Sequence, residues 1–290
     1  AAHLGERLGV TENKVMTTAE HAKNEAWLAG ERFGIGAEFS IVAGRGVVLT
    51  TVFPDSPAAS AGLQADDLLV SIDNHPFIGL PAPVIKARVD RHKARELVFD
   101  VLRTDGTIGR VTVIRGDYQI PPVIHRRVRD GLVLRIAFFG TGAAAEVEDA
   151  ISEWSGAAVI LDLRDNAGGS IDEMVATADL FLDPDTAVVE TAHGGRARYT
   201  LYGTEPAQWT GNVLILMNQG TSGVAEAFVA ALQDHDRVHQ VVGTRSAGLG
   251  IRSSYYPAGR GLVLKIADTR MTSPSGRNWH GKGLVPNVMV

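Results

Sequence analysis

The chain has 290 residues, of which 45% are hydrophobic and 21% charged, an ordinary globular composition that is long enough for about two domains. A net charge of -5 excludes the basic field on which nucleic-acid binding depends, so we expect no nucleic-acid partner. The absence of cysteine excludes disulfides, thiol catalysis and thiolate metal sites.

The N-terminal segment, residues 1–32, is predicted to be helical, because helix formers fill residues 19–28 before Gly30. Ala1 to Arg7 has no basic stretch followed by an apolar core, so we expect no signal peptide there. The longest apolar runs, such as Ala157 to Leu161, are far shorter than the roughly 20 residues of a bilayer helix. We therefore expect no membrane span.

A region of short β-type runs and turns follows over residues 33–116. The runs that predict strands are 39–42, 47–52, 68–72, 97–102 and 109–114. Residues 58–61 predict a short helix, and residues 82–91 predict a longer one. The basic run from Arg91 to Arg95 is expected to form a solvated face.

Pro121 and Pro122 predict a linker, and residues 117–290 form the remaining domain. Its predicted strands are 132–137, 158–163, 212–217 and 238–242, and its predicted helices are 143–154, 171–182 and 225–234. This alternation indicates an α/β core with parallel strands. The tail after residue 262 is predicted to return to strands and turns.

The segment from Asn218 to Glu226 joins a predicted strand to a predicted helix. Such a junction suits nucleophilic catalysis, because the unpaired N–H groups and the positive end of the helix stabilise a nearby anion. Thr221 and Ser222 are also good N-cap residues. The residues alone leave both interpretations open.

Three motifs in the first half of the chain resemble a bacterial PDZ domain: Gly34-Ile35-Gly36, Ser56 to Ala59 and Ala61 to Leu68. The resemblance implies that this region binds protein or peptide C-termini. Backbone N–H groups of a glycine loop hold the terminal carboxylate, and the peptide adds as a strand. The residues expected to do so are Gly34, Ile35, Gly36, Ala37 and Phe39. The alternative is that the two glycines only form a turn and the groove is blocked.

The second half resembles the C-terminal processing peptidases, or tail-specific proteases. The resemblance is carried by residues 160–169, 218–234, 242–250, 273–277 and 281–287. It implies a mixed α/β fold: a peptidase core with an inserted PDZ-like β-sandwich or barrel domain and a short helical N-terminal segment. Members of this family are serine peptidases with a Ser/Lys dyad.

The resemblance places the family's nucleophile at Gly223, its lysine at Leu249 and a supporting glutamine at Ser253. Glycine cannot attack a carbonyl, and leucine cannot accept a proton. Gly168 and Gly169 lie on the oxyanion side, where they either donate N–H groups or only form a tight turn. We therefore expect a pseudopeptidase that binds C-termini.

Two alternatives stay open. An active hydrolase would use Ser222 as nucleophile with His280 or His239 as base. A structural or regulatory subunit would pair with an active paralogue or with itself. His235 and His239 have metal-ligand spacing but no acidic partner pattern, so we expect no metal and no cofactor. The family resemblance implies an exported, periplasmic or cell-envelope setting.

Overall fold

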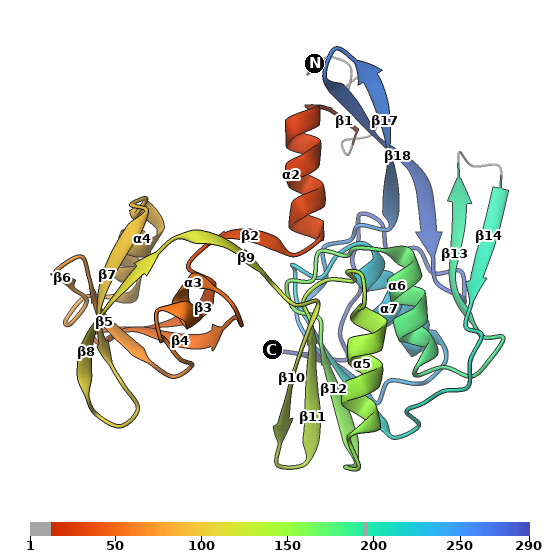
Figure 1. Ribbon diagram of the computed structural model, residues 1–290. Coiled ribbons are helices and arrows are strands. Elements are labelled where there is room, and N and C mark those ends of the chain that lie inside the picture. The colour runs from red at the N-terminus through yellow and green to blue at the C-terminus, as the bar shows by residue number, and fades with distance from the viewer. Residues whose placement is uncertain (1–12, 194–196) are drawn as a thin grey trace. The chain divides into compact units, whose positions relative to one another are not determined.

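The computed structural model describes residues 13–193 and 197–290, and the chain forms two compact units (Figure 1). The smaller unit is Gly30–Pro121, and the larger unit joins the N-terminal residues up to Ala29 to Pro122–Val290. The N-terminal sequence Ala1 to Arg7, for which no signal peptide is expected, lies outside the described residues.

The smaller unit is a mainly antiparallel β structure with two helices. Its elements are β2 (Glu31–Gly34), β3 (Ala37–Val42), β4 (Gly46–Val52), α3 (Pro57–Ser60), β5 (Leu68–Ile72), β6 (His75–Pro76), α4 (Ala82–Arg91), β7 (Glu96–Leu102), β8 (Ile108–Ile114) and β9 (Gly116–Gln119). The main sheet has the order β3-β4-β5-β7-β8, with β6 on β5, while β2 pairs with β9. Every second residue of β7 is buried, as expected when one face of a sheet packs on a core. The strands and helices predicted between residues 39 and 114 are confirmed.

The larger unit contains two sheets. Its elements are β1 (Lys14–Thr17), α2 (Thr18–Leu28), β10 (Val123–Val128), β11 (Gly131–Ile136), α5 (Ala143–Ser152), β12 (Ala158–Asp162), α6 (Ile171–Asp179), β13 (Ala187–His193), β14 (Ala197–Tyr202), β15 (Asn212–Met217), α7 (Val224–Asp234), β16 (Gln240–Gly243), β17 (Ile251–Gly259), β18 (Leu262–Thr272) and β19 (Val288–Met289).

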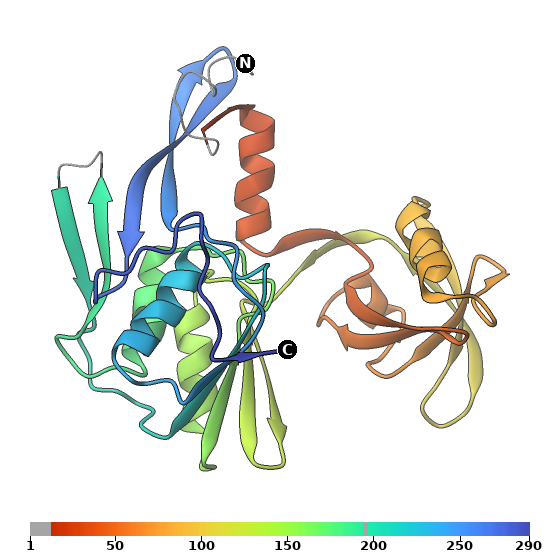
Figure 2. The same ribbon diagram turned by 180° about the vertical axis from the view of Figure 1, so that it is seen from behind.

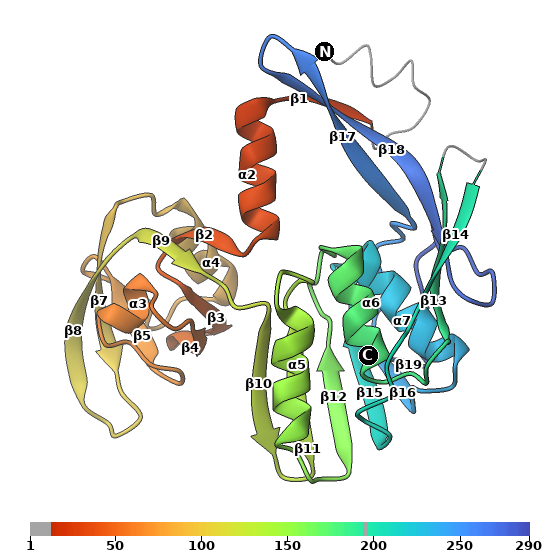
Figure 3. The same ribbon diagram turned by 45° about the vertical axis from the view of Figure 1, so that its right-hand side comes forward.

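The six-stranded sheet has the order β10-β11-β12-β15-β16-β19 and is parallel except for β10. The helices α5, α6 and α7 connect successive parallel strands and pack side by side (Figure 3). Because this order follows the chain and parallel crossovers are right-handed, the three helices share one face of the sheet. Buried residues of α7, including Phe228 and Leu232, belong to the hydrophobic core between this sheet and its helices. The mixed α/β fold class is confirmed.

The second sheet of the larger unit is antiparallel, with the order β1-β18-β13-β14 and with β17 on β18. Helix α2 begins with a capping box in which Thr17 and Glu20 exchange hydrogen bonds. Its first residue, Thr18, donates its N–H to the carbonyl oxygen of Gly261 at 2.9 Å. Figure 2 shows α2 beside the hairpin of β17 and β18, so residues 13–29 of the N-terminal segment pack with the larger unit, whereas residues 30–32 belong to the smaller one. None of the described helices has the length and apolar character needed to cross a membrane.

Candidate functional site

Three parallel strands of the larger unit end at the same edge of the sheet. Asp162 at the end of β12 pairs with Leu216 of β15, and Met217 at the end of β15 pairs with Gly243 of β16. Ligand sites of parallel α/β sheets lie at the carboxyl ends of the strands. The loops that follow these strands carry five of the predicted site residues: Gly168, Gly169, Ser222, Gly223 and Leu249.

Gly223 forms a sharp elbow between β15 and α7. Its backbone angles are φ 64° and ψ −125°, which L-amino acids with a side chain adopt only under strain. A Cβ atom built at this position would have the carbonyl oxygen of Ala167 as its nearest neighbour, at 3.8 Å. The elbow therefore has the sharp geometry of a nucleophile turn and leaves room for a side chain.

The prediction that Thr221 or Ser222 caps α7 is wrong, because the N-cap residue is Gly223. Thr221 is buried, and its hydroxyl donates to the carbonyl oxygen of Leu163 at 2.7 Å while accepting from the N–H of Asn218 at 3.1 Å. These bonds fasten the turn to the end of β12. The sequence could not distinguish this use of the hydroxyl from a cap, because both place it just before a helix.

Glu226 is the charged residue that connects the elbow with the loop after β16. Its buried carboxylate accepts hydrogen bonds from the N–H of Gly223 (3.1 Å), the hydroxyl of Ser246 (2.5 Å), and the N–H groups of Gly248 and Leu249 (both 2.7 Å). A buried carboxylate is tolerated only when such donors replace its water. One side chain thus holds positions 223 and 249 together.

The structural role of Glu226 was not predicted, although the sequence carries a signal for it. Glu226 is the charged residue in a helix whose other residues from Val224 to Leu232 are apolar and buried. A carboxylate inside an apolar helix face needs partners elsewhere in the fold. The identity of those partners depends on the loop 20 residues later, which local spacing does not reveal.

The two glycines after β12 form the predicted tight turn, with φ 104° at Gly168 and 135° at Gly169. A Cβ atom at Gly169 would lie 2.4 Å from the carbonyl oxygen of Phe139. The N–H of Gly168 donates to Oδ1 of buried Asn166 at 2.8 Å, so of the two alternatives the one in which Gly168 donates to an anion is wrong. Gly169 is exposed, and Val224 at the start of α7 presents an N–H that the helix itself does not pair.

Three further predicted residues, Leu249, Ser253 and His280, lie in segments that follow β16. Leu249 is half-buried in the loop after β16, and Ser253 lies on β17 opposite Ala267 in the second sheet. The backbone of His280 lies close to Gly250: its backbone nitrogen would be 2.9 Å from a Cβ atom added at Gly250. The Nδ1 atom of His280 is buried and has no hydrogen-bond partner among the described residues.

His239 is excluded as a catalytic base for Ser222. It precedes β16, and its N–H donates to the carbonyl oxygen of Val213 near the amino end of β15. Ser222 follows the carboxyl end of β15. The strand of Asn212–Met217 separates the two by roughly 15 Å at about 3.3 Å per residue, so this part of the hydrolase alternative is wrong.

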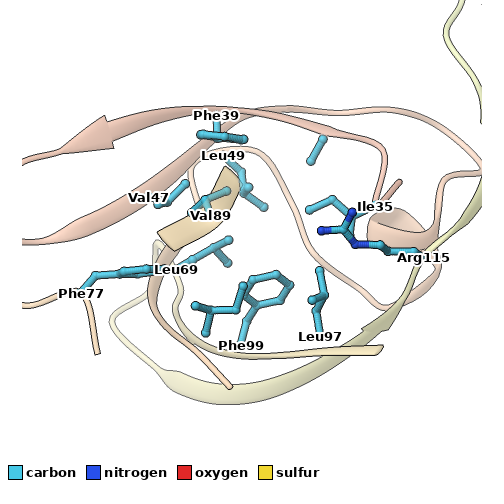
Figure 4. Close-up of a pocket in the computed structure, with 12 residues that line it drawn as sticks. Ile35, Phe39, Val47, Leu49, Leu69, Phe77, Val89, Leu97, Phe99 and Arg115 are labelled. Carbon is cyan, nitrogen blue, oxygen red and sulfur yellow. The ribbon is translucent and has the colours of Figure 1, made fainter. Parts of the chain in front are cut away.

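A second candidate site lies in the smaller unit, where an apolar cavity of about 140 Å³ opens beside the edge strand β3 and helix α4. Ile35, Ala37 and Phe39 lie at alternate positions and line the cavity together with Val89 of α4. Figure 4 shows Ile35, Phe39 and Val89 around it. The other lining residues are Val47, Leu49, Leu69, Ile72, Phe77, Leu97, Phe99 and Arg115. An apolar cavity therefore lies beside the end strand β3, where the resemblance predicts the peptide groove.

The loop before β3 turns its backbone donors away from the body of the unit. The carbonyl oxygens of Ile35 and Gly36 accept from the N–H groups of Ala58 (2.7 Å) and Phe53 (3.0 Å). In a trans peptide the N–H points opposite to the carbonyl, so the N–H groups of Gly36 and Ala37 face the other way. Paired outward N–H groups of this kind form a nest for an anion.

Gly36 is required at its position for two reasons. Its φ is +76°, and an added Cβ atom would lie 2.2 Å from Cβ of buried Ser56. We expect Gly36→Ala to lower the unfolding free energy of the smaller unit by about 3 kcal/mol or more. Urea denaturation of the whole chain measures this loss.

The matched control is Gly44→Ala, because Gly44 has a similar φ of +73° but open space around an added Cβ. We expect it to lose only the conformational cost of about 1 kcal/mol. Equal losses in the two variants would show that contact with Ser56 does not restrict position 36.

The sequence model of Peptidase family S41 matches residues 131–290, and that of the PDZ domain matches residues 48–98. The chain is 28% identical over 283 residues to a probable CtpA-like serine protease of Staphylococcus haemolyticus, covering 96% of this chain and 56% of that protein. A probable CtpA-like serine protease of Staphylococcus epidermidis is 26% identical over 283 residues, covering 96% of this chain and 57% of that protein. The chain thus spans little more than half the length of these relatives.

Solved structures show the same fold. The photosystem II D1 C-terminal processing protease superposes with a TM-score of 0.61 at 21% identity, covering 99% of this chain and 80% of that one. A putative S41 protease from Bacteroides fragilis gives 0.67 at 15% identity, covering 96% and 78%. The resemblance predicted from the sequence motifs is confirmed. Because the S41 model covers more than half of its residues, the chain belongs to peptidase family S41 and carries a PDZ domain.

Proposed function

We propose that this chain is a non-catalytic member of its family that binds the C-termini of proteins or peptides. The observation that carries the proposal is the identity of two residues, Gly223 at the elbow and Leu249 in the loop after β16. Gly223 offers no nucleophile and Leu249 offers no base, although Glu226 holds both backbones in place. Acyl transfer by a serine peptidase needs both groups.

The groove of the smaller unit supplies the binding part of the proposal. A peptide can extend the sheet along the open edge of β3, because β3 is the end strand of its sheet. Its terminal carboxylate would meet the N–H groups of Gly36 and Ala37, and its last side chain would enter the apolar cavity. The guanidinium of Arg115, which lies beside Ile35, adds a positive charge to the lining (Figure 4).

Calorimetry with an apolar C-terminal peptide tests this proposal. We expect the free-acid peptide to bind at least tenfold more tightly than the same peptide with an amidated C-terminus, because the amide loses the charge that the N–H groups recognise. Phe39→Ala is expected to weaken binding, whereas Ile78→Ala, an exposed residue outside the groove, is not. Equal affinity for the acid and the amide would contradict the proposal.

A second candidate function rests on the buried, unpartnered Nδ1 of His280 beside Gly250. It is a hydrolase in which Ser222 attacks and His280 accepts its proton. Activity of the native chain that is lost in Ser222→Ala would favour it over the binding function.

We further propose an exported setting, in the periplasm or the cell envelope. The family resemblance supports this setting, and fractionation of cells that express the full gene would test it.

A further inference from the structure

A larger concavity, of about 420 Å³, lies on a different face of α4 from the peptide groove. Its lining residues are Ile72, His75, Val84, Ala87, Arg88, Arg91 and His92. The α4 positions 84, 87, 88 and 91 have the spacing of one helix face. Ile85 packs in the core and Val89 lines the groove, about a third of a turn away. We call this concavity the α4 basic pocket.

Two arginines set the charge of the α4 basic pocket. Arg88 donates from Nη1 to the carbonyl oxygen of Pro76 at 2.7 Å, which fixes its guanidinium at the rim. Arg91 is exposed. Residues 86–95 contain five Lys and Arg residues and a single acid, Asp90, in a chain whose net charge is -5. Of these basic residues Arg88 and Arg91 line the pocket, and its lining contains no carboxylate.

Among the residues that the structure describes, neither arginine forms an ion pair with an acid. Asp73, the acid closest in sequence to the pocket's β residues, bonds to Nε2 of His92 and accepts the N–H of Val98 at 2.8 Å. Asp90 pairs with Lys86 at 2.6 Å. The partial negative charge at the C-terminal end of α4 stabilises cations in its last turn, which contains Arg88 and Arg91. This helix dipole does not explain the exposed Lys93 and Arg95, which lie beyond that turn.

We propose that the α4 basic pocket binds an acidic segment of a polypeptide, with glutamate or aspartate side chains paired to Arg88 and Arg91. Guanidinium groups pair with carboxylates through two parallel hydrogen bonds. The apolar lining of Ile72, Val84 and Ala87 suits the methylene stem of such a side chain. The mixture of apolar and basic lining residues favours a polypeptide side chain over the head groups of an anionic membrane.

The test uses a fluorescein-labelled peptide of glutamate and leucine residues. Its C-terminus is amidated, so the peptide has no terminal carboxylate that the Gly36 loop could bind. We expect its anisotropy to report binding to the 290-residue chain that weakens with added salt. Binding should fall about fivefold in Arg91→Gln and about twentyfold in the Arg88→Gln, Arg91→Gln double variant. Lys86→Gln removes the same charge from another face of α4 and should change little.

Absence of binding, or an equal loss in Lys86→Gln, would overturn the proposal. Vesicles of phosphatidylglycerol that bind the native chain but not the double variant, while the peptide does not bind, would replace it with membrane attachment. Arg91 is exposed, so Arg91→Gln stays informative even if loss of the Arg88 contact to Pro76 disturbs folding. Unchanged affinity of the double variant for a free-acid apolar peptide separates this pocket from the groove.

Discussion

The Gly223→Ser, Leu249→Lys double variant is expected to cleave an unstructured protein that the native chain leaves intact. The elbow at position 223 already has φ 64° and ψ −125°, and the nearest heavy atom to an added Cβ is 3.8 Å away. Glu226 holds both backbones in register for the two new side chains. A nucleophile and its base act as a unit worth about 10⁶ in turnover, so each single variant should stay inactive.

Digestion of casein, followed on gels, measures this result. The control is Gly44→Ser with Leu249→Lys, which adds the same two side chains but places the serine in a turn of the smaller unit with open space around its Cβ. A serine at the strained elbow costs about 1–3 kcal/mol of stability, so a thermal melt must show that the variant is folded. Cleavage by the native chain at a similar rate would contradict the non-catalytic proposal.

Glu226→Ala is expected to lower the unfolding free energy of the larger unit by about 3–5 kcal/mol, since it leaves several buried donors without an acceptor. Tryptophan fluorescence during urea denaturation would follow the loss. Glu153→Ala is the matched control, because Glu153 is an exposed acid that pairs loosely with Arg127 at 3.7 Å. A similar, small loss in both variants would show that the carboxylate of Glu226 does not hold the two loops together.

Local patterns in the sequence were enough to predict the elements that position the candidate site. The apolar run before Asn218 and the helical spacing after Gly223 gave β15 and α7, with their junction at the elbow. The hairpin of β17 and β18 was missed except for part of β18. Most residues of β17 are half-buried or exposed, so the strand lacks the alternation that marks one buried face.

Contacts between distant residues explain the rest. The acceptor role of Glu226 depends on Ser246 to Leu249, and the pairing of Gly168 depends on Asn166, whose amide nitrogen donates to the carbonyl oxygen of Ile136, 30 residues earlier. The run from Arg91 to Arg95 was predicted as a solvated face. Residues 93–95 are exposed as predicted, but the fold brings Ile72 and His75 beside Arg91 and His92 and makes these two residues part of a concavity.

The open edge of β3 has a consequence for the protein without a ligand. A strand with an unpaired row of N–H and C=O groups is a template for any other extended chain, including an unfolded copy of the same protein. Phe39, which is 40% exposed on this strand, adds an apolar contact for such a misplaced chain. An edge kept free for a ligand is also an aggregation liability, and an occupying peptide should protect the protein at high concentration.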